Sequence, residues 1–248
     1  MGVPAMRPTP TLAERVAALL PRVECRRADS DDLREAIYRL RYDAYNREGT
    51  IPETPSRRLS DRYDGLPNCY LFALFIDDRL ASSIRLHVAS LEHPDIPANQ
   101  VFGEILAPTI AAGRTIIDPT RFVSDAEMAR LYSELPFLTL RIPHMAAEFF
   151  AADIVLATVR SEHQAFYQRV FGHRLAAPPA PYPSLTKPIS LMALDYPQER
   201  QNILRRYPFF ASTAAERRSL FDRGGEWPRH PAAPSIDATE FPAFAGLA

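Results

Sequence analysis

The segment Thr115–Asp125, TIIDPTRFVSD, constrains the fold most, because it places charge and a proline in an apolar strand pattern. It opens with three strand-forming residues, and Gly113 just before it indicates a turn. Pro119 cannot donate a ladder hydrogen bond, so we expect a β-bulge at this residue. The segment therefore predicts a strand that bends away from one of its neighbours.

Asp118 and Arg121 lie three residues apart, and regular alternation would point them to opposite faces of the sheet. A bulge between them would put both on one face and leave backbone N–H groups free to bind something other than a strand. The alternative is a surface ion pair at the end of an edge strand. The segment alone leaves both interpretations open.

The composition bounds the class of protein. At 248 residues with 46% hydrophobic content, the chain suits one sizeable domain, or one domain with appendages. The formal net charge of −1 argues against nucleic-acid binding, although nearly all positive charge is arginine, which favours carboxylates and phosphates. An Arg-, Ala- and Pro-rich chain is also what a GC-rich genome produces.

The location expected from the sequence is the cytoplasm. The apolar stretch Leu12–Leu20 is too short and too polar for a secretion signal or a membrane span. Cys25 and Cys69 are isolated, which fits a reducing compartment.

Several elements precede the central strand. Residues 1–21 are expected to form a loosely attached extension, and Val23–Arg27 a short strand. A helix is predicted from Ser30 to Gly49, with its buried stripe beside a second face that carries Tyr38, Arg41 and Tyr45. Residues 70–88 are predicted to form a hairpin whose second strand contains Arg85, and Asp61 and Asp64 in the preceding loop are its candidate partners.

The remainder alternates between helices and strands. A connector at 90–112 leads to the Thr115 strand, and the helical region Asp125–Phe150 carries more apolar bulk, Leu138 included, than one stripe needs, which indicates core or an acyl pocket. A strand at Asp153–Val159, a helix at Ser161–Phe171, a proline-rich loop at 176–188 and a strand at Ile189–Leu194 follow. Two short helices are predicted near 198–206 and 213–222, then a disordered tail over 224–248.

Familiar catalytic motifs are missing from the sequence. It contains no GxSxG, P-loop or GxGxxG pattern, so serine hydrolases, NTPases and dinucleotide-binding enzymes have no support. His144 and Glu148 share a helical spacing, but one such pair is typical of a surface hydrogen bond rather than a metal site. No metal site is predicted, and arginines and aspartates remain as the candidate chemistry.

Four ordered motifs resemble the acyl-homoserine-lactone synthase branch of the GNAT acyltransferases. They are LRYDAY (Leu40–Tyr45), DRYD (Asp61–Asp64), SIRL (Ser83–Leu86) and DPTRF (Asp118–Phe122). Two departures are visible: Gly49-Thr50 stand where those synthases carry an aromatic residue, usually tryptophan, and Asp118 stands where glutamate is usual. The segment PYPSLTKPISLMALDY, followed by helical sequence, is more similar to the related N-acyl amino acid synthases.

The resemblance implies an α/β (α+β) GNAT-like fold, with a mixed, splayed sheet flanked by helices over residues 22–195 and a C-terminal helical segment at 196–223. It implies an N-acyltransferase that moves a long-chain acyl group from the phosphopantetheine arm of acyl carrier protein to the α-amine of an amino acid, with no tightly bound cofactor. A glycine-rich pyrophosphate turn of the kind used by acetyl-CoA enzymes is missing after the Thr115 strand, which favours the carrier protein as donor.

The same resemblance assigns roles to residues. Asp118 would be the base, Arg121 would orient it, and Asp61 and Asp64 would hold or relay from the ammonium group. Arg41 and Arg85 would fix these acids or bind the acceptor's carboxylate. The other substrate-binding candidates are Tyr38, Tyr45, Phe122 and Leu138. The alternatives are a homoserine-lactone synthase that uses S-adenosylmethionine and a non-catalytic GNAT-fold binding module.

Overall fold

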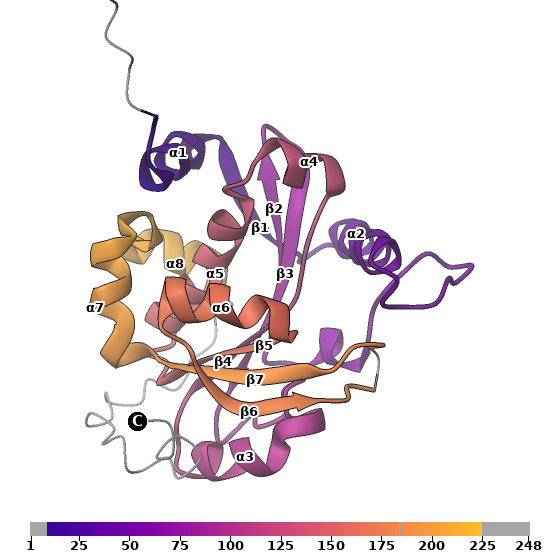
Figure 1. Ribbon diagram of the computed structural model, residues 1–248, viewed down its shortest axis with the longest axis vertical. Helices are drawn as coiled ribbons and strands as arrows, with labels where there is room; N and C mark the ends of the chain where they lie inside the picture. Colours follow the sequence, from indigo (N-terminus) through magenta and orange to yellow (C-terminus); the bar gives the residue numbers. More distant parts are fainter. Residues whose placement is uncertain (1–8, 184, 225–248) are drawn as a thin grey trace, which may run out of the picture.

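A seven-stranded sheet organises the computed structural model, which describes residues 9–183 and 185–224 (Figure 1). The tail expected from residue 224 onward thus lies almost wholly outside the described residues. The strand order is β1-β2-β3-β4-β5-β7-β6. The strands are β1 Val23–Arg27, β2 Cys69–Ile76, β3 Arg79–Ala89, β4 Ile116–Ser124, β5 Ile154–Val159, β6 Arg174–Ala180 and β7 Ile189–Asp195.

The sheet is mixed and splayed, as predicted. All neighbouring strands pair antiparallel except β4 and β5, which are parallel. These two strands pair through only two positions, Ile116 with Ile154 and Ile117 with Val155. Beyond them the strands diverge toward their carboxyl ends, and the gap between them is open to side chains from both faces.

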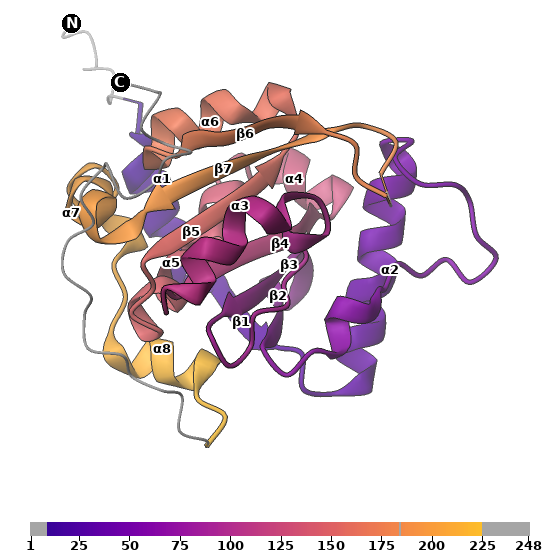
Figure 2. The same cartoon turned by 90° about the horizontal axis from the view of Figure 1, so that it is seen from below.

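Helices cover the two faces of the sheet (Figures 1 and 2). Alternate residues of β2 show the division: Leu71 and Ala73 pack with Ile37 of α2, whereas Phe72 and Leu74 belong to the cluster that contains Leu135 of α5. We call these the α2 face and the α5 face. The α2 face carries α2 Asp31–Arg47 and α3 Asn99–Ala111; the α5 face carries α1 Leu12–Leu19, α5 Leu135–Phe149, α6 Ser161–Phe171, α7 Tyr196–Arg206 and α8 Ala214–Phe221.

Most predicted elements are confirmed, and local chemistry explains their limits. Ser30 caps α2 by accepting from the N–H of Leu33, and Gly49 follows the helix with a φ of 63°. The hairpin of β2 and β3 turns through Asp77 and Asp78, which both have positive φ, as the tight hairpin turns require. The short helix α4 Ala126–Leu131 and α5 divide the predicted helical region.

Two elements differ from the prediction, and both contain prolines. The expected connector at 90–112 includes α3, whose Phe102, Leu106 and Ile110 are buried at helical spacing although Pro108 lies inside the helix. The expected loop at 176–188 includes most of β6, an edge strand with an irregular register. An edge strand tolerates proline because half of its N–H groups need no partner in the sheet.

The N-terminal segment is also more firmly attached than expected. Thr11 and Glu14 form a capping box at α1, and the helix buries Val16 and Leu19 in the main core. The expectation of a loosely attached extension therefore does not hold for α1. Among the described residues, no helix has the length and apolar content needed to cross a membrane.

Candidate active site

The bulge in β4 lies at Arg121 rather than at Pro119. Ser83 pairs with Val123 and Arg85 with Thr120, so Arg121 and Phe122 together oppose a single residue of β3. Pro119 keeps its register opposite Leu86, whereas Arg121 adopts a φ of 54°, which supplies the extra turn of the backbone. Asp118, Thr120 and Arg121 consequently all face α2, which is the side-sharing that the sequence predicts for Asp118 and Arg121.

A continuous chain of charged side chains crosses the α2 face. Arg41 of α2 donates to both Asp64 oxygens at 2.9 and 3.1 Å, and Arg85 of β3 donates to Asp64 at 3.1 Å and to Asp61 at 2.5 Å. Arg121 of β4 completes the chain with a hydrogen bond to Asp61 at 2.9 Å. We call these five residues the charge network.

The loop before β2 positions both acids. Asp61 caps the short 3-10 helix Arg62–Gly65, and its carboxylate accepts from the N–H of Tyr63. Asp64 returns a hydrogen bond by accepting from the N–H of Asp61 at 2.9 Å. The turn expected around Asp64 and its pairing with Arg85 are therefore both present, because Oδ2 of Asp64 accepts from the backbone while Oδ1 accepts from Arg85.

Pairing outweighs burial for the acids of the charge network. Burial by itself would raise the pKa of Asp61, but hydrogen bonds and charge from Arg85 and Arg121 lower it well below the usual value. Burial likewise opposes ionisation of Asp64, and the charges of Arg41 and Arg85 lower its pKa. Both acids are carboxylates at neutral pH, so the network carries three positive and two negative charges.

Asp118 is an isolated buried acid. Its side chain has no exposed surface, Oδ2 accepts from the N–H of Ala98 at 3.0 Å, and Oδ1 has no partner within the described chain. Burial raises the pKa of Asp118 to about 7, although the Ala98 N–H and the charge of Arg85 oppose this rise. Arg121 binds Asp61 rather than Asp118, so it does not orient Asp118 in the way the sequence suggested.

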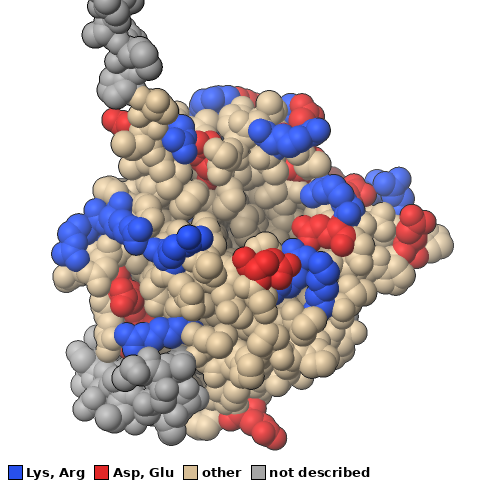
Figure 3. Space-filling view, in the orientation of Figure 1, with Lys and Arg blue, Asp and Glu red and all other residues tan. Residues whose placement is uncertain are grey.

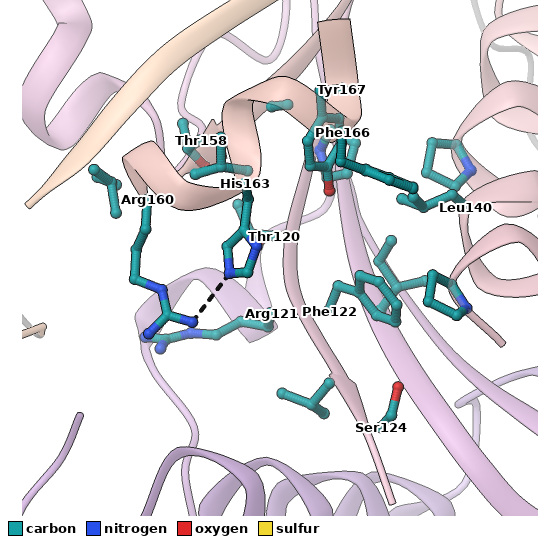
Figure 4. A pocket seen from close by; sticks show the side chains of 18 of the residues that line it. Thr120, Arg121, Phe122, Ser124, Leu140, Thr158, Arg160, His163, Phe166 and Tyr167 are labelled. Carbon is teal, nitrogen blue, oxygen red and sulfur yellow. Dashed lines mark hydrogen bonds between the residues drawn. The ribbon is translucent and has the colours of Figure 1, made fainter. Parts of the chain in front are cut away.

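A cleft of about 620 Å³ occupies the gap between β4 and β5. Its lining includes Tyr45 of α2 on one face of the sheet and Leu140 of α5 and Phe166 of α6 on the other. The cleft therefore passes through the sheet where the two parallel strands diverge. Figure 4 shows Leu140 and Phe166 at the cleft, together with Thr120, Arg121 and Phe122 of β4.

The two ends of the cleft differ in chemistry. Toward the α2 face the lining is charged, whereas toward the α5 face it is largely apolar, with histidines among the rings. The charged lining residues are Arg47, Glu48, Arg121, Arg160 and Lys187, and the apolar end includes Pro136, Leu140, Pro143, Phe166 and Phe171. In the space-filling view of Figure 3, charged side chains gather on the side of the hollow nearest α2.

The structure divides the predicted site residues into two groups. Tyr45, Arg121 and Phe122 line the cleft, and the Tyr45 ring lies 5.2 Å from the Arg121 guanidinium. The others do not line it: Arg41, Arg85, Asp61, Asp64 and Asp118 belong to the polar interior beside it, Tyr38 packs 5.5 Å from Arg41, and Leu138 lies in the core. Arg41 and Arg85 are almost fully buried, so they hold the acids and have no free surface for an acceptor.

Sequence reasoning missed most of the polar residues that line the cleft, among them Arg160 and His163. Arg160 directly follows β5, and its Nη2 lies 3.0 Å from Nε2 of His163 on the first turn of α6 (Figure 4). The signal was present in the sequence, because Arg160 is the first charged residue after the apolar run Ile154–Val159.

The splayed mixed sheet, with a cleft through its gap, is the GNAT-like fold that the sequence predicts. A family model described as the N-acyl amino acid synthase FeeM matches residues 36–195. The chain belongs to this family and is an N-acyltransferase. No curated protein sequence matches the chain.

Solved structures agree on the fold. FeeM, an N-acyl amino acid synthase from uncultured soil microbes, superposes with a TM-score of 0.60 and 19% identity, over 74% of this chain and 96% of FeeM. TofI, in a ternary complex with an inhibitor and MTA, superposes with a TM-score of 0.56 and 14% identity, over 77% of this chain and 100% of TofI. BjaI, a CoA-dependent acyl-homoserine lactone synthase, superposes with a TM-score of 0.53 and 16% identity, over 75% of this chain and 89% of BjaI.

Proposed function

We propose that the chain transfers a long-chain acyl group from the thioester of acyl carrier protein to the α-amine of an amino acid, in the cytoplasm. The observation that supports this most directly is the cleft, which joins an apolar end to a charged end through the sheet. The apolar end suits a fatty acyl chain, and the charged end suits a zwitterionic acceptor. A thioester in the gap between β4 and β5 is accessible from both ends of the cleft.

The gap also provides groups for the transition state. Beyond Ile117, β4 has no ladder partner in β5, so its backbone N–H groups on that side do not pair with that strand. Attack of the amine on the thioester carbonyl creates an oxyanion, and one positioned N–H donor is typically worth about 3 kcal/mol of transition-state stabilisation. The tetrahedral intermediate then expels the pantetheine thiolate, and the nitrogen gives up its second proton, which the thiolate takes, so that an amide and a thiol are formed.

Asp118 is our candidate for the base that takes the proton from the acceptor's ammonium group. It directly precedes Pro119 and Thr120, which line the cleft, and its Oδ1 is unpartnered in the described chain. Because the carboxyl group is fully buried, one water in the gap would have to carry the proton. A pKa of about 7 suits this role, since both protonation states are then populated at neutral pH.

The proposed donor is supported by the segment that follows β4. Residues 125–137 contain no glycine, so they lack the flexible turn that holds a pyrophosphate in acetyl-CoA enzymes. This favours a carrier-protein thioester, although the similar BjaI is a CoA-dependent enzyme. The donor experiment must therefore include both thioesters.

The test is product identification with purified protein. Long-chain acyl carrier protein and acyl-CoA are supplied separately, together with a mixture of amino acids and S-adenosylmethionine, and products are identified by mass spectrometry. An N-acyl amino acid formed from the carrier protein supports the proposal. A homoserine lactone as product, or no acyl product from either thioester, would contradict it.

Replacement of Asp118 tests the base. We expect Asp118→Asn to lower the rate by about 10²–10⁴-fold. The wild-type rate should rise with pH through about 7 as Asp118 loses its proton, and the variant should lack this rise. Asp95→Asn, which removes an exposed acid paired with Arg62, is the matched control. A loss below about threefold with an unchanged melting temperature would remove Asp118 from the role of base.

A further inference from the structure

The charged end of the cleft carries excess positive charge. Its lining contains three arginines and the lysine Lys187 but only one acid, Glu48. A concave surface with one dominant sign of charge attracts a ligand group of the opposite sign. The group that enters this end is therefore expected to be an anion.

Arg160 is the arginine of this end that is both held in position and accessible to a ligand. Arg47, in the last turn of α2, is exposed and reaches the Ser124 carbonyl at 3.5 Å, so its guanidinium is weakly held. Arg121 already donates to Asp61 in the charge network. Arg160 instead contacts Glu48 and Glu162, both at 3.2 Å and both about half exposed, and such rim pairs contribute little in water. Its own side chain is 22% exposed, so an incoming carboxylate can replace these contacts without opening the core.

The position of Arg160 is fixed by its neighbours. It follows the last residue of β5 and precedes α6, so its backbone is set by the sheet. His163, one turn into α6, accepts a hydrogen bond from Nη2 of Arg160 at 3.0 Å, which limits how the guanidinium can turn. The contact with Glu48, which follows α2, places the guanidinium on the α2 face (Figure 4).

We propose that Arg160, assisted by Lys187 from the loop between β6 and β7, binds the carboxylate of the acceptor. This rests on the proposed function, and it assigns the acceptor to amines that carry a carboxylate. The acyl chain takes the apolar end on the α5 face, so the acceptor approaches from the α2 face with its amine toward the gap. A guanidinium binds a carboxylate through two parallel hydrogen bonds, which a neutral carboxamide cannot reproduce.

The experiment compares an amino acid that the enzyme acylates with the carboxamide of the same amino acid. Wild-type enzyme should acylate the acid with a kcat/KM roughly 10- to 100-fold higher than the carboxamide. In Arg160→Gln, the KM for the acid should rise by about this factor, while kcat/KM for the carboxamide stays unchanged. Arg160→Lys should recover part of the loss, because it restores charge but not the fork.

Two further variants frame the result. Lys187→Gln should show the same change in smaller degree. Arg130→Gln removes an exposed arginine that does not line the cleft and that donates to the Ala126 carbonyl of its own helix, so it should leave both substrates unaffected. Each variant is also compared with wild type by thermal unfolding.

Three outcomes would overturn the assignment. The first is equal use of acid and carboxamide by wild type, and the second is an unchanged KM for the acid in both Arg160→Gln and Lys187→Gln. The third is a higher KM for the thioester donor instead, which would show that the anion is the phosphate of the pantetheine arm. Acyl transfer itself would stand in all three cases, whereas failure to acylate any amine would refute the proposed function.

Discussion

The α5 face of the sheet buries mainly apolar side chains, such as Phe72, Leu86 and Ile117. The α2 face buries arginines and acids in addition to apolar side chains. Arg41 and Arg85 have almost no exposed surface, and Asp118 has none. Desolvating such groups costs free energy that apolar residues of the same volume would not cost. The α5 face therefore supplies stability, while the α2 face retains buried charges at a cost in stability.

The largest effect should follow removal of a shared counter-charge. Asp64→Ala leaves Arg41 and Arg85 buried with one carboxylate fewer, and we expect the free energy of unfolding to fall by about 3–5 kcal/mol. Glu127→Gln breaks the exposed pair with Arg79 and should cost less than about 1 kcal/mol. Urea unfolding measures both, and equal losses would mean that the α2 face is no more dependent on its charges than the surface is.

On the α5 face, substitutions of Leu138 and Leu140 should have different effects, the first on stability and the second on the preferred length of the acyl chain. Leu138 lies in the core, so Leu138→Ala should cost about 2–5 kcal/mol of unfolding free energy without changing the preferred acyl chain. Leu140 lines the cleft, and Leu140→Phe should shift the preference toward shorter chains because it narrows the apolar end. Competition between acyl donors of different length checks this. An altered preference in Leu138→Ala alone would relocate the acyl site.

The smallest effect concerns pH. Arg85 and Arg121 lower the pKa of Asp61, so the unfolded chain takes up this proton before the folded one as pH falls. The stability that Asp61 contributes, about 1–3 kcal/mol, is therefore present above the usual Asp pKa of about 3.9 and is lost in more acidic solution. Wild type and Asp61→Asn should differ at pH 7 and converge at acidic pH. A constant difference across this range would exclude the linkage.

Much of the fold could be predicted because local patterns and tertiary packing agree. The stripe of α2, its Ser30 cap and the hairpin turn at Asp77 and Asp78 each follow from residues that are close in sequence. Where local pattern and tertiary packing conflicted, the prediction followed the prolines and expected a connector or a loop. Pro108 concealed the helical spacing of Phe102, Leu106 and Ile110, which packing against the sheet nevertheless stabilises.

The site was predictable in content but not in geometry. The sequence places Asp61 and Asp64 in one loop and Arg85 and Arg121 on two different strands, and a buried arginine needs a charged partner. Which acid a buried arginine pairs with depends on the backbone. The positive φ of Arg121 turns its side chain toward Asp61, so Arg121 binds Asp61 and not Asp118. The sequence does not predict a positive φ at an arginine, because residues with positive φ are mostly glycine or asparagine.

The edge strand β6 has a consequence for the behaviour of the protein at high concentration. An open sheet edge is a template on which a strand of another molecule can add. Pro178 and Pro179 remove two N–H donors from β6, and the register shifts along the strand make its open edge uneven. Replacing both prolines with valine would create a smoother edge, and the protein would then be expected to self-associate and precipitate more readily without any change at the cleft.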